Sequence, residues 1–266
     1  MNTAEAIVNY STVTELSGAR ATRAQLARMY QRYYFAGGFC EGRDVLEIAC
    51  GSGQGLGYLA RRSRSVVGID IDEHVLALAR NYYGDRIEIR QMNAEALSFP
   101  AASFDLVVHF EAIYYLPRPE RFASEVRRVL RPGGILVLCT TNKDLPDFNP
   151  SPFSHQYFGP PELVALLGPH GFTVECLGAD PVGPLTLRGH ALRTLKRAAV
   201  QLDLIPKTMR GKELLKRMVF GSLVELPREI PEGESVELPK SIPADRPDGE
   251  HHVLFAVARR CFDCES

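Results

Sequence analysis

The stretch Glu47–Gly57, with the sequence EIACGSGQGLG, places four glycines at alternate positions directly after an apolar run. A glycine-rich turn that follows the first strand and opens a helix is where doubly wound α/β folds bind nucleotides. Three kinds of loop have this outline: a Walker phosphate loop, a dinucleotide fingerprint, and a loop preceded by an acidic residue within the strand. The spacing of the glycines and the position of charged residues distinguish them.

The first two kinds of loop do not fit. A Walker loop ends in Gly-Lys-Ser/Thr, and no lysine occurs between Cys40 and Lys143. A dinucleotide fingerprint needs G-x-G-x-x-G, but the third glycine is replaced by Leu56 in one register and by Tyr58 in the other. The third kind of loop is left, with Glu47 as the acidic residue.

The rest of the chain continues the alternation of strands and helices. Phe122, Val126 and Val129 have helical spacing, and Pro132-Gly133-Gly134 ends that pattern before the next apolar run. Strands are expected at 44–50, 65–70, 86–92, 104–110, 134–140, 171–178 and 252–260, and helices at 55–62, 73–83, 119–130 and 160–168. Apolar strands that alternate with helices predict a doubly wound, mostly parallel sheet in an α/β fold.

Three regions are expected along the chain. Residues 1–42 form an N-terminal helical cap, because 19–37 fit an amphipathic helix that ends at a pair of glycines. Residues 43–180 and 251–260 form the core. Residues 181–250 are an insertion before the last strand, first basic and helical, then Pro-rich and acidic.

Glu47-Ile-Ala-Cys-Gly51-Ser-Gly53 resembles motif I of the class I S-adenosylmethionine (SAM) methyltransferases, E/D-x-G-x-G-x-G. Ala49 replaces the first glycine of that motif, and alanine is compatible with the position if its φ is negative. The resemblance implies a Rossmann-like, seven-stranded sheet whose last strand is antiparallel. It also implies that SAM is the cofactor and S-adenosylhomocysteine (SAH) the product, and that the glycine loop approaches the amino-acid end and ribose of SAM.

Three later motifs follow in the family's order. VVGIDID ends the second strand at Asp70, which the resemblance places on the ribose hydroxyls, while Asp72 fits a helix N-cap. QMNAEALSFPAASFDLVV (91–108) resembles the family's adenine segment, and 109–138 match the segment after strand four through the Pro-Gly-Gly turn. The resemblance covers 43–178 and places the chain in the group of ubiquinone/menaquinone-biosynthesis-type methyltransferases. The cofactor-binding residues that we predict on this basis are Glu47, Ala49, Gly51, Ser52, Gly53, Asp70, Ile71, Asn93, Ala94, Glu95 and His109.

The catalytic candidates lie where the transferred methyl is expected, after strands four and five. Glu111 follows strand four, and its neighbour Arg118 provides a simple ion-pair explanation for it. His155 and Tyr157 lie in the long aromatic loop 140–163, where His155 could instead cap or pack the loop. Since a general base helps only some nucleophiles, these three residues are predicted as base or orienting groups.

The charge and residue composition of the chain indicate which binding partners to expect. The net charge is −1 and no base-flipping signature follows strand four, so nucleic acid is not expected as a partner. Residues 188–217 carry nine Lys or Arg against two acidic residues, which fits a solvated face, an anionic acceptor or peripheral contact with a membrane. We expect no metal, although Cys261 and Cys264 form one CxxC. With no signal peptide or long apolar segment at hand, a cytoplasmic protein is expected.

The sequence therefore predicts a SAM-dependent methyltransferase that acts on a small molecule, with a saccharide, nucleotide sugar or lipid-linked glycan as the first acceptor class. A quinone-like or specialised metabolite is the alternative acceptor. A SAM-binding scaffold without catalysis is the alternative class of protein. The oligomeric state is left open.

Overall fold

A computed structural model of the chain describes residues 15–183 and 222–262. Its helices are α1 (Arg23–Gly37), α2 (Leu56–Ala60), α3 (Glu73–Tyr83), α4 (Pro119–Val129) and α5 (Pro160–Leu167). Its strands are β1 (Arg20–Ala21), β2 (Asp44–Ile48), β3 (Ser65–Asp70), β4 (Glu88–Gln91), β5 (Phe104–Phe110), β6 (Leu130–Thr141), β7 (Phe172–Pro181), β8 (Val224–Glu225), β9 (Lys240–Ser241) and β10 (His251–Arg260).

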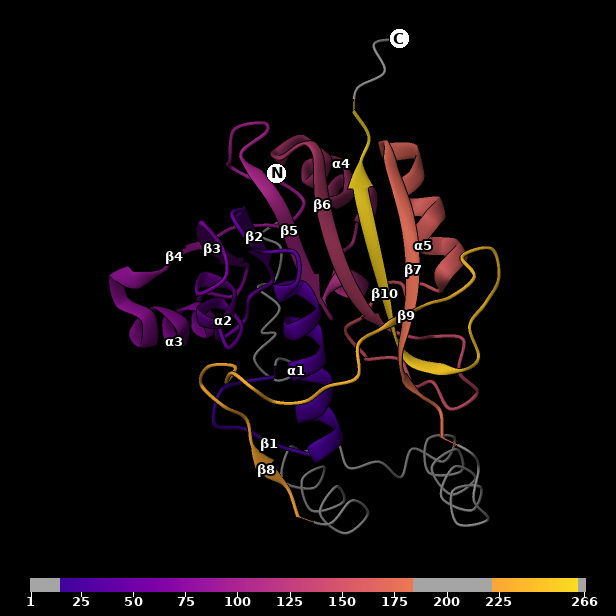
Figure 1. Ribbon diagram of the computed structural model, residues 1–266, viewed down its shortest axis with the longest axis horizontal. Helices are drawn as coiled ribbons and strands as arrows, with labels where there is room; N and C mark the ends of the chain where they lie inside the picture. Colours follow the sequence, from indigo (N-terminus) through magenta and orange to yellow (C-terminus); the bar gives the residue numbers. More distant parts are fainter. Residues whose placement is uncertain (1–14, 184–221, 263–266) are drawn as a thin grey trace, which may run out of the picture.

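One large sheet organises the molecule, in the order β4-β3-β2-β5-β6-β10-β7-β9 (Figure 1). From β4 to β6 neighbouring strands are parallel, and β10 runs antiparallel to both β6 and β7. The chain moves outward from β2 to β4 and then returns to place β5 on the other side of β2. This reversal of strand order opens a crevice at the carboxyl ends of β2 and β5, where ligands bind in doubly wound sheets.

Helices cover both faces of the sheet because the strands are apolar on both faces. On one face α1, α2 and α3 pack on residues such as Val45, Leu106 and Val137. On the other face α4 and α5 pack on residues such as Leu46, Val107 and Leu136. Consecutive residues of one strand thus supply two separate cores.

Helix α1 begins at a capping sequence, with Thr22 as its N-cap residue. The Thr22 hydroxyl accepts a hydrogen bond from the Gln25 amide, and the Gln25 side chain accepts one from the Thr22 amide, which makes a capping box. Met29, Tyr33 and Ala36 are buried against the sheet side of the molecule. The predicted N-terminal helix is present, and one of its faces lines the crevice.

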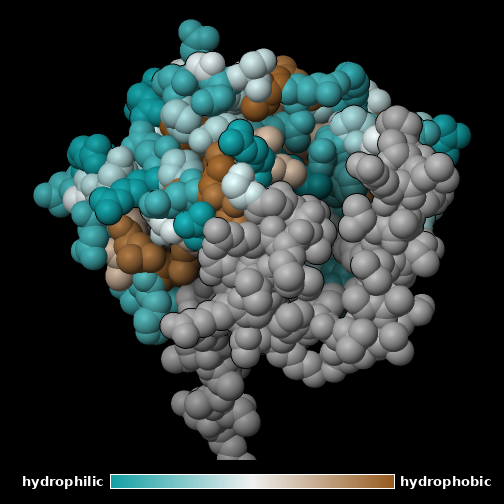
Figure 2. Space-filling model, turned by 90° about the horizontal axis from the view of Figure 1, so that it is seen from below, coloured by the Kyte–Doolittle hydropathy of each residue, from teal (hydrophilic) through white to brown (hydrophobic). Residues whose placement is uncertain are grey.

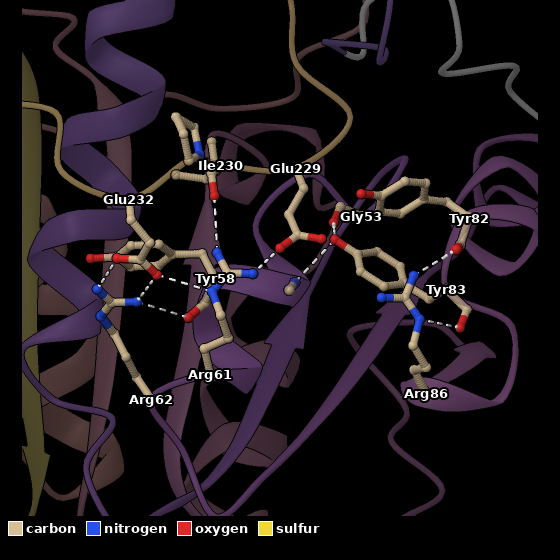
Figure 3. A network of polar contacts seen from close by, with 12 residues as sticks. Gly53, Tyr58, Arg61, Arg62, Tyr82, Tyr83, Arg86, Glu229, Ile230 and Glu232 are labelled. Atoms are coloured by element: carbon tan, nitrogen blue, oxygen red, sulfur yellow. Dashed lines mark hydrogen bonds and ion pairs between the residues drawn. The ribbon is translucent and has the colours of Figure 1, made fainter.

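A return segment, residues 222–242, brings the chain back to the core after residue 221. β8 pairs with β1, the Ile230 amide donates to the Gln54 carbonyl at 2.8 Å, and β9 pairs with β7. Figure 3 shows Glu229 and Glu232 of this segment reaching the guanidinium groups of Arg61 and Arg62 just after α2. The return segment therefore packs directly behind the glycine loop.

The predicted doubly wound, mostly parallel sheet with an antiparallel last strand is confirmed. Two details differ. The two-residue strand β9 makes the sheet eight-stranded, and α4 ends at Val129 because β6 already begins at Leu130 and passes through the Pro-Gly-Gly turn. The basic part of the predicted insertion, 188–217, lies outside the described residues, as does Cys264.

The surface of the described residues is mainly hydrophilic, with separate small hydrophobic patches on the side shown in Figure 2. Among residues 15–183 and 222–262, no helix combines the length and apolar character that crossing a membrane requires. The described part of the chain likewise brings no three His, Cys, Asp or Glu side chains together as a metal site.

Candidate cofactor and acceptor site

A pocket of about 930 Å³ occupies the crevice at the carboxyl ends of β2, β3 and β5. Its walls come from α1, the glycine loop, the end of β3, residues 91–95, the segment after β5, and the loop after β6. Eight of the eleven predicted cofactor-binding residues line it: Ala49, Gly51, Asp70, Ile71, Asn93, Ala94, Glu95 and His109. Glu47, Ser52 and Gly53 do not line it.

The glycine loop is strained at the position where this chain lacks the motif's first glycine. Ala49 has φ +62°, so the condition under which alanine fits this position without strain, a negative φ, is not met. Gly51 and Gly53 also have positive φ, at +56° and +80°. The turn therefore needs three left-handed positions, two of which are occupied by glycine at little steric penalty.

The last two glycines of the loop serve packing. A Cβ on Gly55 would lie 1.7 Å from the Tyr33 ring, and a Cβ on Gly57 would lie 2.3 Å from the Glu229 carboxylate carbon. Gly55 thus admits a tyrosine from α1, and Gly57 admits a glutamate from the return segment. These roles explain the alternate glycines without a dinucleotide.

Asp70 fixes the glycine loop to the end of β3. Its carboxylate accepts a hydrogen bond from the Gly51 amide at 2.9 Å and one from the Asp72 amide at 3.0 Å. Burial raises the pKa of Asp70 above its usual value. A carboxylate has about four lone-pair sites, so Asp70, which lines the pocket, can still accept from ribose hydroxyls. Asp72 caps α3 through the His74 amide, as predicted.

The predicted adenine segment forms a tight turn. The Asn93 side-chain oxygen accepts from the Glu95 amide at 2.8 Å, and both Asn93 and Ala94 line the pocket. Glu95 is buried and binds Arg118, accepting from its amide at 2.7 Å and from its Nε at 2.9 Å. Glu95 therefore fastens the adenine turn to the segment that follows β5.

Two buried titratable groups underlie the pocket. Burial raises the pKa of Glu47 to about 8, although the Tyr33 hydroxyl donates to its Oε1 at 2.6 Å. Burial lowers the pKa of His109 to about 4. Since His109 Nδ1 lies 3.1 Å from the Ile48 carbonyl, Nδ1 carries the proton and Nε2 is an acceptor. Both side chains are neutral at pH 7.

Glu111 is the most constrained catalytic candidate. It has φ +50°, and its Oε2 accepts hydrogen bonds from the Tyr114 hydroxyl at 3.1 Å and the Thr141 hydroxyl at 2.9 Å. The alternative explanation for Glu111, an ion pair with Arg118, does not hold, because Arg118 pairs with Glu95. The nearest described cation to Glu111 is instead Arg32, with Nη1 3.8 Å from Oε1. Strained residues of this kind concentrate at functional sites.

The loop after β6 brings His155 to the pocket but not Tyr157. The His155 amide donates to the Tyr114 carbonyl at 2.8 Å, and His155 is exposed at the rim. Tyr157 stacks on the Tyr114 ring at 4.6 Å, and its hydroxyl accepts from the Ser151 amide. Tyr157 therefore supports Tyr114, which itself holds Glu111.

Sequence reasoning missed several polar or aromatic residues of the pocket. Among them, Arg32 and Tyr33 lie on α1, Gln54 lies within the glycine loop, and Thr141 ends β6. A basic residue on the apolar side of α1 was a signal for Arg32. No local signal existed for Tyr33 and Thr141, because their partners Glu47 and Glu111 are distant in sequence.

Unpartnered polar atoms test whether the pocket suits SAM. Arg32 Nε, Gln54 Nε2, Asp72 Oδ2 and His109 Nε2 are buried and have no hydrogen-bond partner within residues 15–183 and 222–262. All four residues line the pocket. SAM offers a carboxylate, an ammonium, ribose hydroxyls and adenine nitrogens, so it carries both the acceptors and the donors that these atoms need. The residues fit the cofactor.

Comparison with known proteins agrees with the geometry. Residues 46–138 match the family model described as a methyltransferase domain. A probable S-adenosylmethionine-dependent methyltransferase of Mycolicibacterium smegmatis is 42% identical over 142 residues, which are 51% of this chain and 54% of that protein. A ubiquinone biosynthesis O-methyltransferase of Pseudomonas aeruginosa is 33% identical over 137 residues, which are 49% of this chain and 57% of that protein.

Among solved structures, a SAM-dependent methyltransferase of Thermotoga maritima, described as a possible histamine N-methyltransferase, aligns with TM-score 0.56 and 16% identity. The alignment covers 89% of this chain and 92% of that one. This likeness supports the fold.

Residues 46–138 therefore match a methyltransferase domain, and the relatives that the chain resembles include SAM-dependent methyltransferases and ubiquinone biosynthesis O-methyltransferases. SAM is the cofactor that the domain implies. The chain spans about half the length of the curated relatives that it matches.

Proposed function

We propose that this chain is a SAM-dependent methyltransferase that methylates a hydroxyl of a small-molecule acceptor, with saccharides and lipid-linked glycans as the first class to test. The observation that carries the proposal is Glu111. Its carboxylate is held by two hydroxyls at the end of β5, on the wall of the pocket. A hydroxyl nucleophile gains from such a base, whereas a neutral amine does not need one.

The residues divide the work. SAM, when bound, supplies an electrophilic methyl group on a sulfonium. Asp70 and the glycine loop fix the position of the cofactor, and orientation of this kind supplies about 7–11 kcal/mol in well-aligned reactions. Tyr114 and Thr141 hold Oε2 of Glu111. Oε1 accepts only the weak hydrogen bond of the Cys139 thiol at 3.7 Å, so a lone pair of Oε1 can accept the proton of an acceptor hydroxyl. His155 stands at the rim, where it orients the acceptor.

The polar character of the acceptor end favours a hydroxyl-rich acceptor. Arg28 and Arg32 line this end together with Glu15 and Glu111, so positive and negative groups are balanced. Such a surface offers donors and acceptors to a neutral polyol or sugar. A separate proposal rests on the positive charge of residues 188–217: this segment contacts an anionic membrane or lipid carrier.

An acceptor screen tests the proposal. The chain is incubated with SAM and, separately, with simple glycosides, nucleotide sugars, a catechol and amines, and SAH formation is measured. We expect turnover with a hydroxyl acceptor, and about 100-fold slower turnover in Glu111→Gln with unchanged SAH affinity. Methylation of amines alone would contradict the hydroxyl proposal.

The competing candidate is a SAM-binding scaffold without catalysis. Tight binding of SAM with no SAH formed from any acceptor would favour it. The quinone-like acceptor is distinguished by the catechol in the same screen.

A further inference from the structure

Arg28 of α1 is held in the pocket wall by Asp180, the residue before the last of β7. Its Nε donates to the Asp180 carboxylate at 2.5 Å. Within residues 15–183 and 222–262, Nη1 and Nη2 of Arg28 have no hydrogen-bond partner. Arg28 lines the pocket, and its side chain is partly exposed. The guanidinium group therefore has a fixed orientation and two nitrogen donors left for a ligand.

Asp180 shows the backbone strain that is found at functional sites. It has φ +53°, a left-handed conformation that residues other than glycine seldom adopt. His252 Nδ1 lies 3.0 Å from the Asp180 carbonyl oxygen and 3.3 Å from its Oδ2. Although burial raises the pKa of Asp180, the hydrogen bond of His252 and the charge of Arg28 hold it below its usual value. The carboxylate is therefore charged at pH 7 and can orient Arg28.

These contacts place Arg28 at the acceptor end of the pocket. Asp180 lies near the end of β7, which is separated from the cofactor strands β2 and β3 by β5, β6 and β10. Val253 of β10 lines the pocket and pairs with Thr141, whose hydroxyl donates to Glu111. Arg28 is thus tied to the same side of the sheet as the candidate base.

The spacing along α1 relates Arg28 to Glu111. Arg28 and Arg32 are four residues apart and lie next to each other on the helix, with about 5–6 Å between such Cβ atoms. Arg32 Nη1 lies 3.8 Å from Glu111 Oε1. A ligand the size of one sugar ring can therefore place one hydroxyl at Glu111 and its neighbours at Arg28.

The charge of this end of the pocket selects the chemical class of ligand. In the described part of the chain, the carboxylates of Glu15, Glu111 and Asp180 outnumber the guanidinium groups of Arg28 and Arg32 there. A phosphate or carboxylate on the acceptor would add to that negative charge, which is unfavourable. Hydroxyl oxygens accept N–H donors without adding charge, and the rigid fork of a guanidinium suits two neighbouring oxygens.

We propose that Arg28, oriented by Asp180, donates to two neighbouring hydroxyl oxygens of an uncharged saccharide and so determines which sugar hydroxyl reaches Glu111. The inference rests on the proposed function and makes its acceptor class more specific. Arg28 recognises the acceptor and does not contribute to the affinity for SAH.

The test compares Arg28→Lys with the wild type in steady-state kinetics of the full chain. The acceptors are methyl glycosides, their deoxy analogues that lack one hydroxyl beside the methylated one, and the matching uronides. Lysine keeps the positive charge but lacks the planar fork. We expect the KM for the glycoside to rise about 10-fold, while the Kd for SAH changes less than about twofold.

Selectivity provides the second measurement. The wild type should prefer the glycoside over its deoxy analogue by about 10-fold or more in kcat/KM, because the analogue leaves a donor of Arg28 unpaired. Arg28→Lys should lose most of that preference, and it should give a mixture of methylated positions where the wild type gives one. Product analysis by NMR shows the position.

Two further variants test the orientation of Arg28. Asp180→Asn keeps the shape and tolerates the left-handed conformation but weakens the hold on Arg28, so the KM for the glycoside should rise about threefold. Arg23→Lys is the matched control, because Arg23 is exposed on the same helix and does not line the pocket. Its kinetic constants should equal those of the wild type.

The outcomes separate the inference from the proposed function. Unchanged KM and unchanged selectivity in Arg28→Lys would contradict the inference, as would turnover of the uronides or of the catechol but of no neutral glycoside. Hydroxyl methylation would stand in each of these cases. If no hydroxyl acceptor gave SAH, the proposed function would fail and the inference with it.

Discussion

Ala49 and Gly53 show what single residues contribute to the glycine loop. Both have positive φ, but Ala49 carries a Cβ in that conformation and Gly53 does not. A left-handed conformation costs a non-glycine residue about 1–2 kcal/mol, whereas the extra backbone freedom of glycine costs about 0.5–1 kcal/mol on folding. The loop therefore carries a small strain at Ala49.

Opposite substitutions at these two positions should have opposite effects. We expect Ala49→Gly to raise the free energy of unfolding by about 0.5–1 kcal/mol. Gly53→Ala should lower it by more than 1 kcal/mol, because the new Cβ would also lie 2.9 Å from the Ala79 Cβ. Urea unfolding of both variants measures this. Destabilisation by Ala49→Gly would mean that φ at Ala49 is not strained.

At the scale of elements, the return segment combines ion pairs with one buried side chain. Glu232 pairs with Arg61 and Arg62 at the surface, and it is half exposed (Figure 3). Ile230 is fully buried beside the glycine loop. Exposed pairs contribute about 0–1 kcal/mol, whereas truncating a buried isoleucine to alanine costs about 2–5 kcal/mol.

The attachment of the return segment should therefore depend on Ile230. We expect Ile230→Ala to lower the free energy of unfolding by about 2–4 kcal/mol, and Glu232→Gln by less than 1 kcal/mol. Chemical unfolding at low and high salt compares the two. A larger loss in Glu232→Gln would show that the charges hold the segment.

The same elements show how far sequence alone reaches. Periodicity predicted the seven main strands and the helices, and the resemblance to the family predicted eight cofactor-binding residues that line the pocket. The short strands β1, β8 and β9 were not predicted. The roles of Gly55 and Gly57 were not predictable, because Tyr33 and Glu229 reach them from distant parts of the chain. The motif also gave no φ value, so the strain at Ala49 was not predictable from the sequence.

At the scale of the whole molecule, Glu47 links stability to pH. Burial raises its folded-state pKa to about 8, from a usual value near 4.5. Below about pH 4.5 Glu47 is protonated in both the folded and the unfolded chain, so its contribution to stability is full there. Above that pH the unfolded chain loses the proton while the folded chain keeps it, which favours unfolding. The contribution of Glu47 falls as the pH rises toward 8, by at most about 1.4 kcal/mol per unit.

Glu47→Gln keeps an acceptor for the Tyr33 hydroxyl and removes the titration. We expect the stability of this variant relative to the wild type to increase steadily from pH 5 to pH 8, as measured by denaturant unfolding at each pH. A constant difference in the free energy of unfolding between the two proteins across that range would show that the pKa of Glu47 is not raised by folding.

The central claim is that the crevice binds SAM, and calorimetric titration with SAM, SAH and NAD tests it most directly. We expect saturable binding of SAM and SAH and none of NAD. Asp70→Ala should weaken SAM binding about 100-fold, because Asp70 holds the glycine loop and offers the ribose acceptors, whereas His155→Ala should leave it unchanged. Binding of NAD, or full SAM affinity in Asp70→Ala, would contradict this assignment of the site.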